Sequence, residues 1–171
     1  MMNLTWKIVP HIKLLDCEKK EIAELKNMHW SYGIDSQMNW MNDNIKDFDL
    51  HLMGSNEKQK LVAYMTIVRL SVSFDGGKED ALGVGGVCVN KNIEHRGYGR
   101  CLVQEANNFI SQEGLKGLLL CKDGLVDFYK KCGWQNVVFS EAYVADKPFS
   151  YRIMAYPNLI GCQSVLIDRN F

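Results

Sequence analysis

The sequence of 171 residues has no excess of charge of either sign, because 20 Lys and Arg residues balance 20 Asp and Glu residues. No global electric field therefore points to nucleic acid or to an anionic membrane as a partner. No apolar run approaches the roughly 20 residues of a membrane-spanning helix. The first ten residues lack the layout of a signal peptide. We therefore expect a cytoplasmic protein that binds neither nucleic acid nor membranes, folded as one domain over residues 1–171.

The six cysteines form no Cys-x-x-Cys pair, and the His residues lie far from them along the chain. We therefore expect no metal site built from neighbouring residues. Four of the cysteines lie among apolar neighbours in predicted strands or helices, which is typical of reduced, partly buried thiols in the cytosol. Cys88 and Cys121 are alternative candidates for a cysteine nucleophile, because either side chain could face a cofactor channel.

The segment 84–103 carries the strongest functional signal. An apolar, β-prone stretch ends near Val89, and a polar loop leads from it to Gly97 and Gly99. After Gly99 the apolar residues recur with the spacing of one helical face. The helix is therefore predicted to begin near Gly97–Gly99. Its first N–H groups lack intrahelical partners and, with the positive end of the helix dipole, favour an anion.

The residue types in this loop suit a phosphate. Gly97 and Gly99 let the backbone approach closely, while Arg96 and Arg100 add charge-assisted donors. A Walker loop would need Gly-Lys followed by Ser or Thr, and a dinucleotide fingerprint would need a glycine at Leu102, so both are excluded. The alternative is that the glycines only form a turn and the arginines only cover the surface.

A second segment, 118–134, is predicted to be a buried strand followed by a short helix. Asp123 is a candidate N-cap and Gly133 a candidate C-terminal glycine of that helix. Phe128 and Tyr129 come late on the helix, shortly before Gly133 and Trp134. The order of strand, capped helix and Gly-Trp adds to the signal of the first segment.

Together the two segments resemble the GNAT superfamily of acetyl-CoA-dependent N-acetyltransferases. The pyrophosphate loop of that family reads Gln/Arg-x-x-Gly-x-Gly/Ala, and the chain has Arg96-Gly97-Tyr98-Gly99-Arg100-Cys101, with Cys101 in place of the final Gly or Ala. The second hallmark, Phe-Tyr-x-x-x-Gly-Trp/Phe, matches from Phe128 to Trp134.

The resemblance implies an α/β GNAT fold. The expected architecture is a mixed central sheet of about six to seven strands, with a V-shaped splay and helices on both faces. The parallel strands that end near Val89 and begin near Gly117 would form the splay, and pantetheine would pair with the first of them as an added strand. The residues expected to bind acetyl-CoA are Val87, Cys88, Val89, Arg96, Gly97, Tyr98, Gly99, Arg100 and Cys101.

The other elements follow from periodicity and turn signals. Helices are predicted from Asp16, its candidate N-cap, to residue 30, and over residues 36–45 and 123–132. Pro10 suggests that the first strand is an edge strand or has a bulge. Loops are expected over residues 54–58 and 75–80, and the tail 157–171 is expected to pack back on the domain. Strands are predicted over residues 4–15, 48–53, 60–73, 81–90, 117–122, 135–144 and 151–156.

Acetyl transfer needs a proton donor for the departing thiolate, and Tyr129 is the candidate that the resemblance supports. An unperturbed tyrosine has a pKa near ~10 and is protonated at neutral pH. The alternative is that Tyr129 only packs and hydrogen-bonds the sulfur.

The sequence does not single out one residue as the general base that accepts the proton of the amine. Many family members have a Glu where this chain has Gly85. Glu79, Asp80, Asp49 and His51 are candidates to accept the proton through water, and otherwise the amine loses it in bulk water.

The expected reaction is transfer of the acetyl group from acetyl-CoA to a primary amine of a small molecule. Several segments resemble aminoglycoside 2′-N-acetyltransferases, and one also resembles arylalkylamine N-acetyltransferases. A polycationic substrate would suit the acidic residues Asp35, Asp43, Asp47 and Asp49. The alternatives are a protein or peptide N-acetyltransferase and a non-catalytic CoA-binding sensor domain. A homodimer is left open.

Overall fold

The computed structural model describes residues 3–171, which fall into two compact units. Unit 1 combines the described residues up to Val68 with Gly86–Val103, and unit 2 combines Arg69–Gly85 with Gln104–Phe171. Three elements run through both units, namely β3 (Leu61–Phe74), β4 (Gly77–Val89) and α3 (Tyr98–Glu113).

In unit 1, β1 (Thr5–Pro10) pairs with β2 (Leu50–Ser55), and β2 pairs with β3, both in antiparallel order. Among the described strands β1 pairs with β2 alone, so Pro10 lies at the end of an edge strand, as predicted. Besides parts of β3, β4 and α3, the elements of unit 1 are β1 (Thr5–Pro10), η1 (His11–Lys13), α1 (Asp16–Asn27), α2 (Ile34–Asn44), β2 (Leu50–Ser55) and η2 (Lys91–Ile93).

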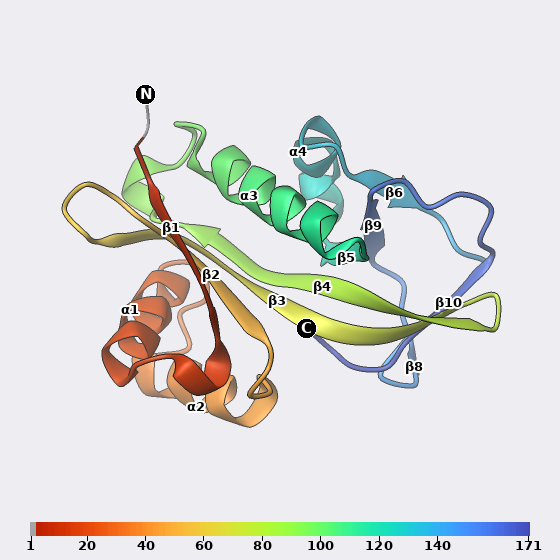
Figure 1. Ribbon diagram of the computed structural model, residues 1–171, viewed down its shortest axis with the longest axis horizontal. Helices are drawn as coiled ribbons and strands as arrows, with labels where there is room; N and C mark the ends of the chain where they lie inside the picture. Colours follow the sequence, from red (N-terminus) through yellow and green to blue (C-terminus); the bar gives the residue numbers. More distant parts are fainter. Residues whose placement is uncertain (1–2) are drawn as a thin grey trace. The chain divides into compact units, whose positions relative to one another are not determined.

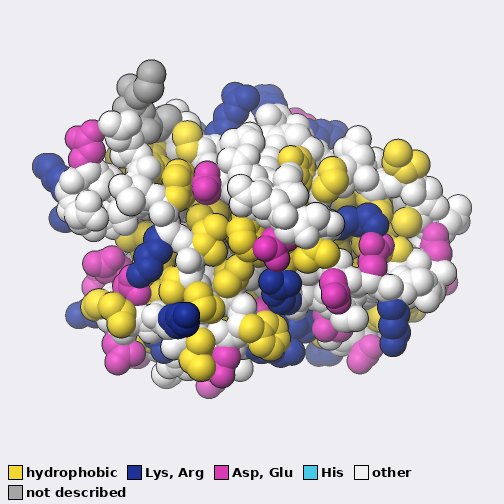
Figure 2. Space-filling view, in the orientation of Figure 1, with side chains coloured by type: hydrophobic (Ala, Val, Ile, Leu, Met, Phe, Trp, Pro, Cys, Tyr) yellow, Lys and Arg dark blue, Asp and Glu magenta, His cyan; other side chains and the backbone are white. Residues whose placement is uncertain are grey.

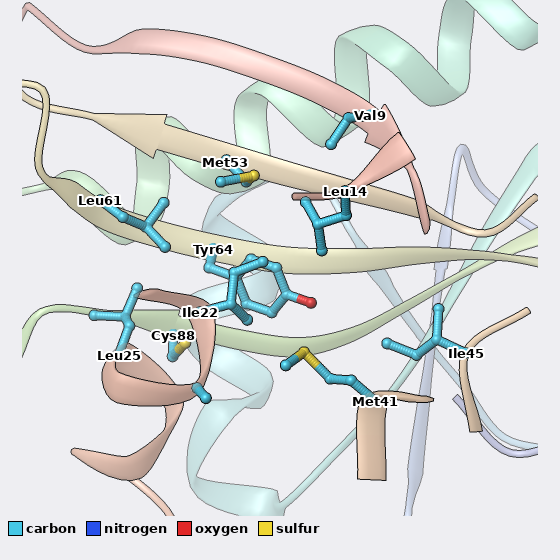
Figure 3. Close-up of a cluster of buried hydrophobic side chains, with 11 residues drawn as sticks. Val9, Leu14, Ile22, Leu25, Met41, Ile45, Met53, Leu61, Tyr64 and Cys88 are labelled. Atoms are coloured by element: carbon cyan, nitrogen blue, oxygen red, sulfur yellow. The ribbon is translucent and has the colours of Figure 1, made fainter. Parts of the chain in front are cut away.

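The helices α1 and α2 lie together beside the strands of unit 1 (Figure 1). Apolar side chains from both helices and from β1–β4 form one buried cluster (Figure 3). Ile22 of α1, Met41 of α2 and Tyr64 of β3 are completely buried in it. Burial of this apolar area stabilises the unit, because each large side chain contributes about 1.5–3 kcal/mol when it leaves water.

The further strands of unit 2 are β5 (Lys116–Cys121), β6 (Gln135–Val137), β7 (Glu141–Val144), β8 (Lys147–Pro148), β9 (Arg152–Tyr156) and β10 (Ser164–Ile167). The strand order in the sheet is β6-β9-β5-β4-β3-β10-β7-β8. The pairs β4–β5 and β10–β7 are parallel, while β5–β9, β6–β9, β10–β3 and β7–β8 are antiparallel, so the sheet is mixed. The helices of this unit, besides part of α3, are η3 (Asp123–Leu125) and α4 (Val126–Lys131).

Gly117 of β5 allows close packing in unit 2. A Cβ atom there would lie 2.7 Å from Cδ1 of Ile110 on α3 and 3.0 Å from Cη2 of Trp134. No larger residue fits without displacing one of these side chains. The pairing of β5 with β4 covers Ala81–Val84 and Lys116–Leu119 and then ends, as expected for parallel strands that splay apart.

The structure corrects several predicted elements. Residues 3–171 form ten strands rather than the expected six to seven. One reason is that the tail contributes β10, whose short apolar run gave no strong strand signal. The segment 75–80 is not a loop, since β4 already begins at Gly77 after a tight turn in which Asp75 and Gly76 have positive φ. The N-cap of α1 is Leu15, with Glu18 reaching back to its N–H, rather than Asp16. Asp123 lies in the short η3 helix ahead of α4.

Side chains of both charge signs are interspersed on the face that Figure 2 shows, in keeping with the balanced composition. None of the helices in residues 3–171 is long and apolar enough to span a membrane. In the same described part of the chain, no group of three or more His, Cys, Asp or Glu side chains is arranged to hold a metal ion.

Candidate active site

The predicted phosphate loop lies in unit 1 and ends at the start of α3. The helix begins at Tyr98, within the predicted range, and the Cys101 N–H donates to the Gly97 carbonyl at 3.1 Å. Gly97 has a φ of 91°, a conformation that a side chain would strain. Arg96 and Arg100 are both exposed. The loop therefore offers helix N-terminal N–H groups and two guanidinium groups to an anion, which fits a pyrophosphate.

The strand that leads to this loop has an outward-facing carbonyl. The Asn90 N–H donates to Val62 of β3 at 2.8 Å. The carbonyl of Val89 belongs to the same peptide unit, and in a trans peptide the N–H and C=O point in opposite directions. The Val89 oxygen therefore points away from β3, as pairing with an added strand requires.

Gly86 breaks the regular geometry of β4 three residues earlier, with a φ of 59°. A Cβ atom on Gly86 would lie 3.8 Å from both Cε1 of Tyr64 and Oγ1 of Thr66. Gly85, Gly86 and Val87 are half-buried, in contrast to the buried residues before them. This stretch of β4, which contains the predicted cofactor residue Val87, is thus irregular and partly accessible.

The side chain of Cys88, a candidate nucleophile, is buried in the core of unit 1. It is 4% exposed and lies in the apolar cluster with Ile22 and Leu25 of α1 (Figure 3). Burial raises the pKa of the thiol to about 12, although Lys26 opposes the shift. Burial also raises the pKa of Cys121, which is 7% exposed. Both groups are therefore thiols at neutral pH, which leaves Cys88 only its backbone for a cofactor.

Tyr129 lies in unit 2 on α4 and is 5% exposed. Its ring packs edge-on against Phe128 and Trp134, and its carbonyl accepts the Trp134 N–H at 3.0 Å. Gly133 has a φ of 91° and allows the chain to turn after α4, as predicted. Burial raises the pKa of the Tyr129 hydroxyl, so it keeps its proton at neutral pH.

His51, a candidate base, is completely buried in a polar chain. Its Nδ1 lies 2.8 Å from the Tyr64 hydroxyl and its Nε2 lies 2.9 Å from Nδ1 of His11. A neutral imidazole has one donor and one acceptor, and it can hold both bonds. Burial, together with the charges of His11, Lys26 and Lys19, lowers the pKa of His51 to about 3. His51 is therefore a structural histidine and a poor base.

Two of the other three candidate bases are held in structural contacts. Asp49 is completely buried, and its Oδ2 accepts the Lys46 N–H at 2.8 Å. Glu79 forms an ion pair with Lys116 at 2.8 Å in unit 2. Asp80 is exposed on the same part of β4. None of them occupies a position that singles it out as the acceptor of a proton.

The acidic residues expected to attract a polycation are only partly available. Asp35, Asp43 and Asp47 are exposed in unit 1, whereas Asp49 is buried. A separate hollow of about 260 Å³ lies in the same unit and contains none of the predicted cofactor residues. Its lining residues are Glu21, Glu24, Leu25, Met28, Lys60, Leu61 and Asn90.

One residue at the outward edge of β4 was not predicted. His29, just after α1, donates from Nε2 to the Val89 carbonyl at 2.6 Å. The two residues are 60 positions apart in sequence, and a histidine after a helix gives no local signal of such a contact.

The sequence matches the profile of the family described as Acetyltransferase (GNAT) family over residues 19–134, which is more than half of the chain. The chain therefore belongs to this family, and the mixed sheet and the four α-helices of the described residues agree with its fold. Membership makes the protein an acyl-CoA-dependent N-acetyltransferase.

Solved structures of the same fold include ElaA from Escherichia coli, with a TM-score of 0.64 and 20% identity, covering 90% of this chain and 99% of ElaA. An acyl-CoA N-acyltransferase from Pseudomonas aeruginosa has a TM-score of 0.62 and 18% identity, with 90% and 99% covered. An aminoglycoside 6′-N-acetyltransferase complexed with coenzyme A has a TM-score of 0.61 and 16% identity, with 87% and 95% covered. No curated protein sequence matches this chain.

Proposed function

We propose that this protein transfers the acetyl group of acetyl-CoA directly to a primary amine of a small molecule. The observation that carries the proposal is the continuous path in unit 1 from the outward Val89 carbonyl to Gly97 and the start of α3. That path supplies a strand edge for the pantetheine amides and N–H groups for the pyrophosphate. The proposed cofactor residues are Val87, Cys88 and Val89 and the loop residues 96–101.

Tyr129 is the proposed proton donor. The amine nitrogen attacks the thioester carbonyl carbon, the carbon–sulfur bond breaks, and the Tyr129 hydroxyl gives its proton to the departing sulfur. The amine releases one proton to water, and Tyr129 regains a proton from water, so the charges balance. Burial raises the pKa of the Tyr129 hydroxyl, so the group holds a proton at neutral pH and has one to donate. A backbone N–H near Val87 or Cys88 is the proposed partner of the carbonyl oxygen.

We propose that the acceptor amine loses its proton to water rather than to a dedicated side chain. Support comes from the four candidate bases, since His51 and Asp49 are buried in structural contacts, Glu79 is paired with Lys116, and Asp80 is exposed on the strand. The prediction is that activity rises with the fraction of neutral amine.

An aminoglycoside-like or arylalkylamine-like acceptor is the proposed substrate class. The exposed carboxylates Asp35, Asp43 and Asp47 in unit 1 support a cationic acceptor, and one protein of the same fold is an aminoglycoside 6′-N-acetyltransferase. Protein or peptide amines, and binding of CoA without turnover, are the competing functions.

The test begins with a calorimetric titration of the protein with acetyl-CoA. One-to-one binding at micromolar affinity supports the cofactor assignment, and failure of folded protein to bind contradicts it. A panel of aminoglycosides, arylalkylamines and short peptides then follows, with free thiol release as the readout. Turnover with peptides alone would establish protein acetylation, and binding without turnover on any amine would establish the sensor function.

A further inference from the structure

The imidazole of His29 lies at the outward side of β4. Its Nε2–H donates to the Val89 carbonyl at 2.6 Å, and this carbonyl points away from β3 because the Asn90 N–H of the same peptide unit is bonded to Val62. Val89 is one of the β4 residues proposed to bind the cofactor, and β4 is the strand proposed to pair with pantetheine. His29 is therefore already hydrogen-bonded to the Val89 oxygen, the acceptor that the proposed cofactor needs.

The second nitrogen of the ring faces the loop that leads to the phosphate site. Nδ1 lies 3.8 Å from Oε1 of Glu94, which follows the short η2 helix. The Asn90 side chain accepts the Asn92 N–H at 3.0 Å and braces the start of this loop. The His29 side chain is 19% exposed, so it borders solvent rather than the core. One side chain thus contacts the strand edge and the approach to Arg96.

We propose that His29 is a further residue of the acyl-CoA site, where its N–H stands in for a pantetheine amide until the coenzyme binds. The inference rests on the proposed function. An amide that pairs with β4 as an added strand approaches the Val89 oxygen from the outward side. A donor already at 2.6 Å fills that direction. Binding of pantetheine therefore exchanges one N–H···O bond for another and releases the imidazole.

This exchange predicts how the loss of His29 changes the affinity for coenzyme A and for its nucleotide part. The imidazole competes with the pantetheine arm, but the nucleotide end of the coenzyme binds at the loop and at α3 and does not use the Val89 oxygen. Loss of the imidazole is therefore expected to strengthen the binding of the complete coenzyme by about 3- to 10-fold, which corresponds to the free energy of one ordinary hydrogen bond. The same loss leaves the affinity of the nucleotide alone unchanged.

The experiment is a calorimetric comparison of two probes on three proteins. The probes are coenzyme A and adenosine 3′-phosphate 5′-diphosphate, which lacks the pantetheine arm, and the proteins are wild type, His29→Ala and His29→Gln. His29→Ala is expected to bind coenzyme A more tightly and the nucleotide equally. His29→Gln keeps a side-chain N–H donor and is expected to stay near wild type. Equal or weaker binding of coenzyme A by His29→Ala, or a parallel change for both probes, would overturn the inference.

A second measurement avoids substitution altogether. In wild-type protein with 15N-labelled histidine, coenzyme A is expected to shift the Nε2 resonance of His29, and the nucleotide is expected to leave it in place. A resonance that coenzyme A does not move would overturn the inference even if the variants failed to fold. Wild type that binds neither probe would contradict the proposed function itself, whereas binding with no selectivity for the arm would contradict only the role of His29.

Discussion

Asn107 of α3 stabilises the turn that follows α4 by hydrogen bonds to Trp134 and Cys132. The Trp134 Nε1–H donates to Oδ1 of Asn107 at 2.8 Å, and Nδ2 of Asn107 donates to the Cys132 carbonyl at 2.8 Å. Asn107 and Trp134 are each 2% exposed. Because the Trp134 backbone N–H also donates to the Tyr129 carbonyl, Asn107 acts on the element that carries the proposed proton donor.

Asn107→Leu is expected to lower the free energy of unfolding by about 1–3 kcal/mol, because the buried indole N–H of Trp134 loses its acceptor. Denaturant unfolding measures the change. Asn108→Leu, on the exposed side of the same helix, is the control and is expected to stay within about 0.5 kcal/mol. In a Trp134→Phe background the effect of Asn107→Leu is expected to shrink, and an unchanged effect would show that the indole bond does not matter.

Tyr129→Phe is expected to lower turnover by about 100-fold or more while the affinity for acetyl-CoA changes little, since only the proton donor is removed. Steady-state kinetics with an acceptor from the amine panel, together with calorimetry, separate the two effects. Tyr151→Phe, on a side chain 65% exposed, is the matched control. Full turnover in Tyr129→Phe would exclude this hydroxyl as the acid.

Gly99→Val is expected to abolish acetyl-CoA binding and leave the fold intact. A branched side chain in the first turn of α3 would block the approach of a phosphate to the backbone N–H groups. Calorimetry and thermal unfolding measure binding and fold. Gly124→Val is the matched control, because a Cβ atom there meets nothing within 4 Å. Tight binding of acetyl-CoA by Gly99→Val would contradict the loop assignment.

The buried His51 predicts how stability depends on pH. Burial lowers its pKa to about 3 in the folded protein, whereas an unfolded histidine titrates near 6.5. Between these values the unfolded chain binds more protons, so the free energy of unfolding falls as pH falls, by up to about 1.4 kcal/mol per pH unit. Burial and the charge of Lys19 lower the pKa of His11 as well, so it acts in the same direction.

Unfolding experiments between pH 7 and pH 4 test this prediction. His51→Gln keeps polar contacts but does not titrate, and it is expected to flatten the slope. The charged groups that act on the two histidines are Lys19, Lys26, Asp47 and Asp49, and all remain in this variant. His95→Asn is the control, because His95 is exposed in a left-handed conformation that Asn tolerates. An identical slope in His51→Gln would contradict the assignment.

Patterns confined to one segment predicted the structure well. The start of α3 at Tyr98, the strand β5 and the glycine turn after α4 each depend on residues that lie side by side in sequence. The resemblance to a known fold predicted the parallel pairing of β4 with β5, and the structure confirms this pairing.

Features that depend on distant residues were missed or misread. The strand β10 is four residues long, and an apolar pattern of that length is too short to distinguish a strand from an apolar tail. His51 looked like a base, because its ordinary pKa suits proton transfer, but contacts with His11 and Tyr64 from other elements decide its role. The contact of His29 with Val89 likewise joins two parts of the chain that only the fold brings together.

The position of β10 between β3 and β7 has a consequence for the order of folding. Val165 pairs with Phe74 in antiparallel register, and Ser164–Ile167 pairs with Glu141–Val144 in parallel. The edge of β3 in unit 2 therefore stays unpaired until a segment about 90 residues further along has been synthesised and has returned to it. During that interval the nascent chain presents an open strand edge, which is a site for association with other chains. Closure by β10 is therefore expected to be a late, non-local and slow step.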